Sequence, residues 1–121
     1  MSWEIIFYEM DDGEKPVYDF IDNLPTSEKA KIYKEIDLLE EHGIKIGLPR
    51  AKDIKGERYK KLWELRVRFN NVFFRIFYFL FTGKKFILLH VCKKKKRKTD
   101  KNDLEIARER MLNYQQRVGL K

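Results

Sequence analysis

The chain has 121 residues, of which 43% are hydrophobic, including nine Phe, six Tyr and two Trp. This composition excludes an intrinsically disordered chain, and the length fits one domain spanning residues 1–121. The formal net charge is +8, unevenly distributed: residues 1–60 hold 10 Lys or Arg against 14 Asp or Glu, and residues 61–121 hold 17 against 5. A second half this basic indicates a polyanionic partner, either nucleic acid or an anionic membrane surface.

The cellular location is indicated by three features of the sequence. Cys92 is its only cysteine, which excludes an internal disulfide and suits a reducing compartment. The first residues show no basic segment followed by an apolar run, so we expect no secretory signal. The longest apolar run is interrupted by Arg75 and is too short and too charged to span a membrane. We therefore expect a cytoplasmic protein.

The first half of the sequence predicts one strand, two helices and a loop. In chain order these are a strand at residues 3–8, a short helix opened by Pro16 and ended by Pro25, a longer helix capped by Thr26 or Ser27 and stopped by Gly43, and a loop at residues 43–60. Aromatic and β-branched residues favour the strand, and apolar residues at helical spacing favour the helices. Gly, Pro and scattered charges favour the loop.

The second half predicts a β-meander followed by a helix. In chain order these are strands at residues 63–69, 72–81 and 86–92, turns at residues 70–71 and 82–84, and a last helix capped by Thr99 or Asp100. The order β-α-α-β-β-β-α predicts an α+β fold. We expect a small antiparallel sheet, made of the three-strand meander and the N-terminal strand. The two N-terminal helices and the C-terminal helix are expected to pack on one face of it.

A two-residue turn at residues 70–71 sets the register of the first hairpin. It places Arg66 directly opposite Arg75 on one face, about 5 Å apart at Cβ, with Glu64 on the same face. Two opposed arginines repel and require anions, of which Glu64 would supply one and a bound phosphate another. The alternative is that these three side chains form a solvated ladder on the open face of the sheet.

A run of positive charge at residues 93–98 connects the last strand to the last helix, so we expect it to lie beside the same face. A polyanion would neutralise this run; the alternative is a solvated loop.

Phe77 is a candidate for stacking on an unstacked RNA base, with a core position as the alternative. His42 and His90 are far apart in sequence, so no metal site is expected. His90 remains a reserve candidate for proton transfer.

Four segments carry a resemblance to a known family. They are DFIDNLP at residues 19–25, LWELR at 62–66, FRIFY at 74–78, and the Lys run followed by LEIA at 104–107. With these segments the chain resembles the RelE/HigB superfamily of toxins from bacterial toxin–antitoxin systems, in particular a phage-derived HigB-like branch. The resemblance implies a RelE-like fold and a type II toxin.

The resemblance further implies a ribosome-dependent endoribonuclease that works without a metal or cofactor. It would cleave mRNA in the ribosomal A site, by attack of a 2′-hydroxyl on the adjacent phosphate. The implied partners are the mRNA, the ribosome with its RNA, and a cognate antitoxin. In this branch the antitoxin is often a helix-turn-helix DNA-binding protein.

The resemblance also suggests which residues form the site. Arg75 matches the family's conserved arginine of the second meander strand, Arg66 the arginine ending the first, and Lys94 and Lys95 the late basic pair. With Glu64 as a candidate base, the predicted catalytic set is Arg75, Arg66, Lys94, Lys95 and Glu64, and the predicted RNA-binding set is Arg68, Lys93, Lys96, Arg97, Lys98 and Phe77. The lysines that RelE carries in its first meander strand are absent here, so the general base and acid stay open.

Two other functions also stay open. One is a non-enzymatic toxin similar to ParE, which inhibits DNA gyrase. The other is an RNA- or ribosome-binding module without catalysis. The late basic cluster favours an RNA partner over gyrase, and only the resemblance separates the endoribonuclease from the plain binding module.

Overall fold

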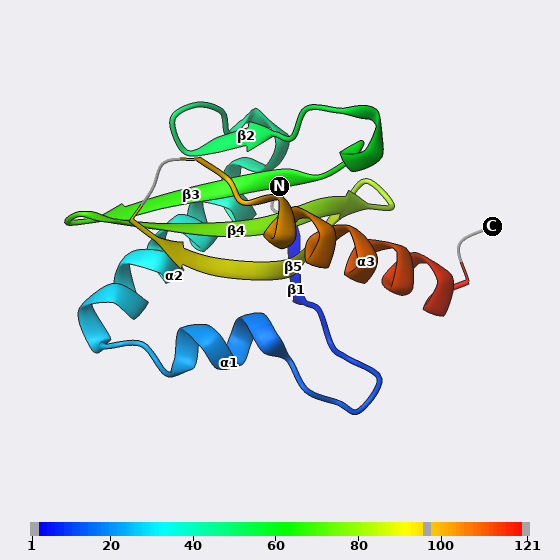
Figure 1. Cartoon of the computed structure of the whole chain (residues 1–121), viewed down its shortest axis with the longest axis horizontal. Helices are drawn as coiled ribbons and strands as arrows, with labels where there is room; N and C mark the ends of the chain where they lie inside the picture. The colour runs from blue at the N-terminus through cyan, green and yellow to red at the C-terminus, as the bar shows by residue number, and fades with distance from the viewer. Residues whose placement is uncertain (1–2, 96–97, 120–121) are drawn as a thin grey trace.

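The computed structural model describes residues 3–95 and 98–119 and has an α+β fold (Figure 1). Within these residues, three α-helices accompany a five-stranded sheet. The strands are β1 (Glu4–Phe7), β2 (Ala51–Asp53), β3 (Trp63–Phe69), β4 (Val72–Phe81) and β5 (Lys85–Lys94), and the helices are α1 (Pro16–Asp22), α2 (Thr26–His42) and α3 (Lys101–Arg117). The predicted elements are all present, and β2 is additional.

The additional strand β2 lies in residues 43–60, where a loop was predicted. It pairs antiparallel with β3, and its Ala51 lies opposite Leu65. Ala51 is buried and belongs to the core, so packing against β3 rather than local propensity makes this strand. Three residues are too few for an alternating pattern, which is why the sequence did not reveal it.

The strand order in the sheet is β1-β5-β4-β3-β2. Strands β3, β4 and β5 form the predicted antiparallel meander, and the hairpin register is confirmed: Arg66 lies opposite Arg75, and Glu64 lies opposite Phe77. However, β1 runs parallel to β5, so the expectation of a wholly antiparallel sheet is wrong. Most of the chain separates these two strands, and no tight turn constrains their relative direction.

The helices cover both faces of the sheet, whereas one covered face was predicted. Helices α1 and α2 pack over a core that includes Phe74 and Ile76, and α3 packs over Phe77 and Phe79 on the other face. In Figure 1, α3 crosses in front of the sheet and α2 lies behind it. Strand β4 is apolar on both sides, and such a strand needs cover on both faces. Helix α3 therefore covers part of the face that was predicted to be open.

The helix ends follow local signals with one exception. The predicted cap of α2 by Thr26 or Ser27 is wrong, because α2 starts at Thr26 without a side-chain cap bond. It stops at Gly43 as predicted, where φ is +57° and the Trp3 ring leaves no room for a Cβ. Asp100 caps α3 by accepting from the backbone N–H of Asn102 at 3.0 Å. In the described part of the chain, none of the helices has the length and apolar content of a membrane span.

Candidate nucleic-acid interface

Strands β3, β4 and β5 present three consecutive cross-strand rows on the face covered by α3. Directly paired residues share a face, so the paired positions define each row. The outer row is Arg68, Phe73 and Lys94; the middle row is Arg66, Arg75 and Cys92; the inner row is Glu64, Phe77 and His90. The sequence prediction of one face shared by the meander arginines and a late lysine is therefore confirmed for Lys94.

A β-bulge in β5 brings the β5 members of these rows to this face. The register shifts at Phe77 and Tyr78, where Leu89 is the extra residue on β5. Leu89 packs in the α3-side core, and the next residue, His90, contacts α3 as well. Because side chains alternate along a strand, an unbulged β5 with Leu89 on this side would turn His90 and Lys94 to the opposite face. The bulge therefore contributes directly to the composition of the interface.

The middle and inner rows contain a buried ion cluster centred on Glu64. Its carboxylate Oε2 accepts a hydrogen bond from Arg75 Nη1 at 2.9 Å and lies 3.0 Å from Arg66 Nε. Its Oε1 accepts from the Thr99 hydroxyl at 2.7 Å. Glu64 thus supplies the anion that the two opposed arginines were predicted to need. Thr99 lies two residues before the start of α3, so the segment that leads into that helix closes over the cluster.

Burial changes how Arg75 and Glu64 can act. Each is only 1% exposed, so the alternative of a solvated ladder is wrong. Arg75 also has little surface left for a direct phosphate contact in this conformation. The Glu64 carboxylate is enclosed by its hydrogen-bond donors and is not placed to take a proton from a bound hydroxyl. Arg66, in contrast, keeps about a third of its side chain exposed, at 32%.

The outer row is the open part of the face. Arg68 is exposed, and Phe73 and Lys94 are half-buried. The Arg68 guanidinium lies over the Phe73 ring, 5.6 Å from its centre. Phe77, the predicted stacking residue, is fully buried and stacks on His90 with ring centres 5.9 Å apart. It belongs to the α3-side core and offers no ring surface to a base, so Phe73 is the aromatic residue of these three rows that keeps exposed surface.

The late basic run divides between two faces instead of forming one patch. Lys93 and Lys94 are the last residues of β5, so they point in opposite directions. Lys93 faces α2, where its Nζ lies 3.3 Å from Glu28 Oε1. Lys95 and Lys98 are exposed. Lys96 and Arg97 lie outside the described residues.

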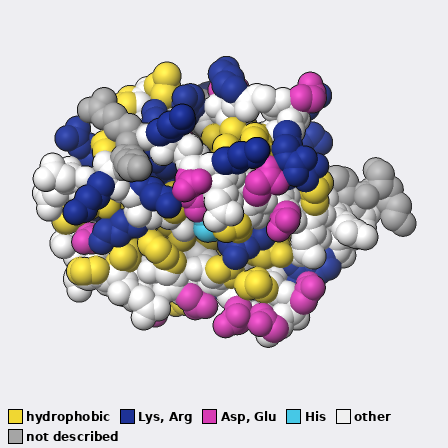
Figure 2. All heavy atoms as spheres, in the orientation of Figure 1, with side chains coloured by type: hydrophobic (Ala, Val, Ile, Leu, Met, Phe, Trp, Pro, Cys, Tyr) yellow, Lys and Arg dark blue, Asp and Glu magenta, His cyan; other side chains and the backbone are white. Residues whose placement is uncertain are grey.

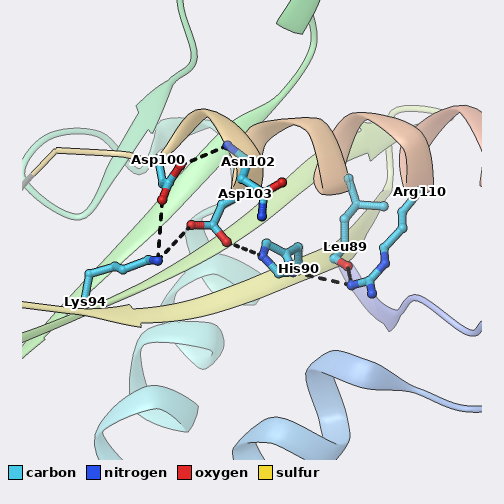
Figure 3. A network of polar contacts seen from close by, with 7 residues as sticks. All are labelled: Leu89, His90, Lys94, Asp100, Asn102, Asp103 and Arg110. Carbon is cyan, nitrogen blue, oxygen red and sulfur yellow. Dashed lines mark hydrogen bonds and ion pairs between the residues drawn. The ribbon is translucent and has the colours of Figure 1, made fainter.

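A polar network holds the start of α3 against β5 (Figure 3). His90 Nε2 lies 2.8 Å from Asp103 Oδ1, and the other carboxylate oxygen of Asp103 lies 3.5 Å from Lys94 Nζ. On the far side of the imidazole, Arg110 Nη1 donates to the Leu89 carbonyl at 2.9 Å. Figure 3 shows His90 between the Asp103 and Arg110 side chains, both from α3.

The titration of these groups follows from this network. Burial lowers the pKa of His90, and the nearby Asp103 carboxylate opposes this only in part. The charge of Asp103 is the main cause that raises the pKa of Lys94. Burial raises the pKa of Cys92 to about 12, so its sulfur is a neutral thiol at physiological pH. The network therefore favours a neutral imidazole and a firmly protonated Lys94 ammonium.

A pocket of about 450 Å³ lies at the end of β3 that is nearest the outer row. Its lining is mostly basic: Lys31, Glu35, Pro49, Arg50, Arg66, Val67, Arg68, Phe73 and Arg75. Figure 2 shows Lys and Arg side chains gathered at the end of the molecule where the β3–β4 hairpin lies. Among residues 3–95 and 98–119, no cluster of three His, Cys, Asp or Glu side chains is suited to a metal ion.

The sequence profile of the phage-derived Gp49-like proteins (DUF891) matches residues 19–112. The chain belongs to this Gp49-like family. The matched region includes all three cross-strand rows and most of α3. The family is associated with RelE/HigB-like toxins. No curated protein matches the sequence significantly.

Several interface residues of this Gp49-like chain were not identified from the sequence. Asp103 was not assigned to the site, because its contacts with His90 and Lys94 on β5 depend on how α3 packs against the sheet. Lys31 and Arg50 lie in a helix and a predicted loop, and no local pattern connects them with the meander. Phe77 and not Phe73 was placed in the predicted RNA-binding set, because only the position of α3 decides which of the two rings is accessible.

Proposed function

We propose that this Gp49-like protein is the toxin of a type II toxin–antitoxin system and a ribosome-dependent endoribonuclease. The observation that carries the proposal is the open, cationic outer row with its adjoining basic pocket, in a chain of a family associated with such toxins. The proposed substrate is mRNA in the ribosomal A site. The proposed partner that silences it is an antitoxin, such as a helix-turn-helix DNA-binding protein.

The proposed reaction needs positioning and charge neutralisation above all. A 2′-hydroxyl oxygen attacks the adjacent phosphorus in line and forms a 2′,3′-cyclic phosphate, while the bond from phosphorus to the 5′-oxygen of the next nucleotide breaks. The 2′-hydroxyl loses its proton, the leaving 5′-oxygen takes one up, and negative charge develops on the phosphate oxygens between these events. We assign phosphate binding to Arg66 and Arg68, because both guanidinium groups retain exposed surface. Lys94, which remains protonated beside Asp103, would stabilise the developing charge, and Lys95 would bind the flanking backbone.

Arg75 takes a different role from the one implied by the family resemblance. Its guanidinium is buried against Glu64, which in turn lies 3.0 Å from Arg66 Nε. We therefore propose that Arg75 and Glu64 are positioning residues that hold Arg66 in place. His90 is engaged by Asp103 and near Arg110, so it is not a free base in this conformation. Accordingly, the proposal does not depend on a general base from this cluster.

Inducible expression in bacteria, followed by primer extension on cellular mRNA, tests this function. We expect growth arrest, with mRNA cleavage within translated regions. Arg66→Ala should remove both effects, whereas Lys34→Ala, at an exposed position of α2, should remove neither. Growth arrest with intact mRNA, or no growth arrest at all, would overturn the proposal.

A second candidate function is RNA or ribosome binding without catalysis. The observation that favours it is that Glu64 and His90, two groups able to accept a proton, are both engaged by internal partners. Such a module would bind RNA with a steep salt dependence and leave it uncleaved. Incubation of ribosomes and mRNA with the purified protein distinguishes the two functions by the presence or absence of cleaved product.

A further inference from the structure

The pocket beside β3 differs from the outer row in its construction. Its cationic side chains come from three separate parts of the chain: Lys31 from α2, Arg50 from the segment before β2, and Arg66 and Arg68 from β3. Val67, on the opposite face of β3, also lines it. The pocket therefore extends around the edge of the sheet instead of lying on one face. Its volume of about 450 Å³ is within the usual range of ligand pockets.

The positive charges that line this pocket outnumber the negative charges in its lining. Glu35 is the only carboxylate residue of the lining, and it is paired with Arg50 at 3.0 Å. Arg66 shares Glu64 with Arg75. Within the described part of the chain, neither Lys31 nor Arg68 forms an ion pair. Positive charges that converge without counter-charges favour an anionic ligand.

The apolar part of the lining indicates an anion that also carries an apolar or aromatic group. Pro49, Val67 and Phe73 provide apolar surface, and the Arg68 guanidinium lies over the Phe73 ring. An aromatic ring with an arginine beside it is a common surface for an unstacked nucleobase. An inorganic anion or an acidic peptide would use the cations but would leave this aromatic surface without a matching group.

The backbone of β3 adds a donor at the same edge. The last bond between β3 and the segment before β2 runs from the Arg66 N–H to the Arg50 carbonyl, at 2.7 Å. Backbone groups of an antiparallel strand point to the same side at every second residue. The Arg68 N–H is therefore directed to this edge too, beyond the start of β2 at Ala51. A phosphate at the edge could accept from it as well as from the side chains.

We propose that this pocket binds one unstacked nucleotide of a single-stranded RNA. Lys31 and Arg68 contact its phosphate, and the base packs against Phe73. The pocket thus adds to the proposed function a subsite for a nucleotide that flanks the scissile bond. The identification of the ligand as part of an RNA strand rests on that function.

Binding measurements on the full purified chain test the pocket without ribosomes. Isothermal titration uses adenosine monophosphate, adenosine and inorganic phosphate, and then a short single-stranded RNA. NMR titration with adenosine monophosphate is expected to shift the backbone amide signals of Arg68 and Phe73. The RNA is expected to bind more tightly than the mononucleotide, which in turn should bind more tightly than phosphate. A mononucleotide that binds as tightly as the RNA would identify a free-nucleotide site instead.

Two variants separate the phosphate and base contributions. The double variant Lys31→Gln/Arg68→Gln should weaken binding of adenosine monophosphate and of RNA at least tenfold. The matched control Lys34→Gln/Lys45→Gln removes the same charge at exposed positions outside the pocket and should change both affinities less than twofold. Phe73→Leu should reduce the affinity for adenosine monophosphate to that for phosphate. Circular dichroism verifies the fold of each variant.

Three results would overturn the pocket assignment. They are no binding of adenosine monophosphate or phosphate to the wild type, equal losses in the pocket variant and its control, or tighter binding of an acidic peptide than of the RNA. The proposed function is tested separately by mRNA cleavage. Nucleotide binding without mRNA cleavage would sink that function and leave the pocket, whereas mRNA cleavage by a protein that binds neither adenosine monophosphate nor phosphate would sink the pocket alone.

Discussion

The inner and outer parts of the α3-covered face use similar residues for opposite purposes. Near Glu64 and Arg75 the charges are buried and neutralise one another. One row beyond the Arg66–Arg75 pair, toward the β3–β4 turn, Arg68 and Phe73 remain accessible. The difference is the cover supplied by α3 and by Thr99 in the segment that leads into it. A shift of two strand positions therefore separates a structural ion cluster from a surface that can meet a ligand.

Removal of the central carboxylate should have the largest effect on the closed region. Glu64→Ala leaves the Arg75 charge buried without its main counter-charge, and breaking such a pair costs about 3–5 kcal/mol. Urea unfolding followed by circular dichroism measures the loss of stability. Glu57→Ala removes a carboxylate at an exposed position and serves as the control. Similar unfolding midpoints for the two variants would show that the cluster is not a stabilising centre.

On the open region, a single arginine should affect binding but not stability. Arg68→Ala removes an exposed guanidinium, so we expect RNA affinity to fall about tenfold while the unfolding midpoint stays unchanged. If one phosphate contact is lost, the slope of log affinity against log salt should fall by about 0.7, the value for single strands. Fluorescence anisotropy across a salt series measures both quantities. An unchanged slope would argue against a phosphate contact at Arg68.

The two histidines provide a test based on pH. Burial lowers the pKa of His90 below its ordinary value of 6.5, so around and below pH 6.5 the unfolded chain binds more protons than the folded chain. The contribution of His90 to stability is therefore complete above pH 6.5. It is lost as the pH falls toward the lowered pKa, by about 1.4 kcal/mol per pKa unit of difference.

Urea unfolding between pH 7.5 and 5 measures this contribution. His90→Gln should flatten the decline in stability with falling pH. His42→Gln, at an exposed position of α2, should leave it as in the wild type. Equal profiles for the two variants would show that the decline has another source.

The smallest expected effect is a difference in RNA affinity between variants of two neighbouring lysines, Lys94 and Lys93. Lys94→Gln should weaken RNA binding severalfold, because Lys94 lies in the outer row. Lys93→Gln should change it less than twofold, because Lys93 faces α2 and contacts Glu28. The two variants remove the same charge at adjacent positions, so each serves as the control for the other. Equal effects in an RNA-binding assay would mean that the run acts as an unstructured cationic segment.

The sequence predicted the parts of the interface that depend on local geometry. The two-residue turn before Val72 set the hairpin register, which correctly placed Arg66 opposite Arg75 and Glu64 on the same face. It left open whether Phe77 would stack on a base or lie in the core, because this depends on where α3 packs; the structure places it in the core. It also missed the β5 bulge, which adds one residue at Leu89 and leaves no sign in the hydrophobic pattern.

The order of the main elements, the meander register and the concentration of positive charge in the second half could all be predicted without the structure. These features follow from turn chemistry, side-chain periodicity and composition, all of which act over short stretches of chain. Which charges are neutralised and which remain exposed depends instead on how the elements pack in three dimensions. Residues from separate elements meet at three places in the structure. They enclose Arg75, they form the network around Asp103, and they line the pocket that contains Lys31. Long-range packing sets the exposure of a charge, and local sequence carries no record of it.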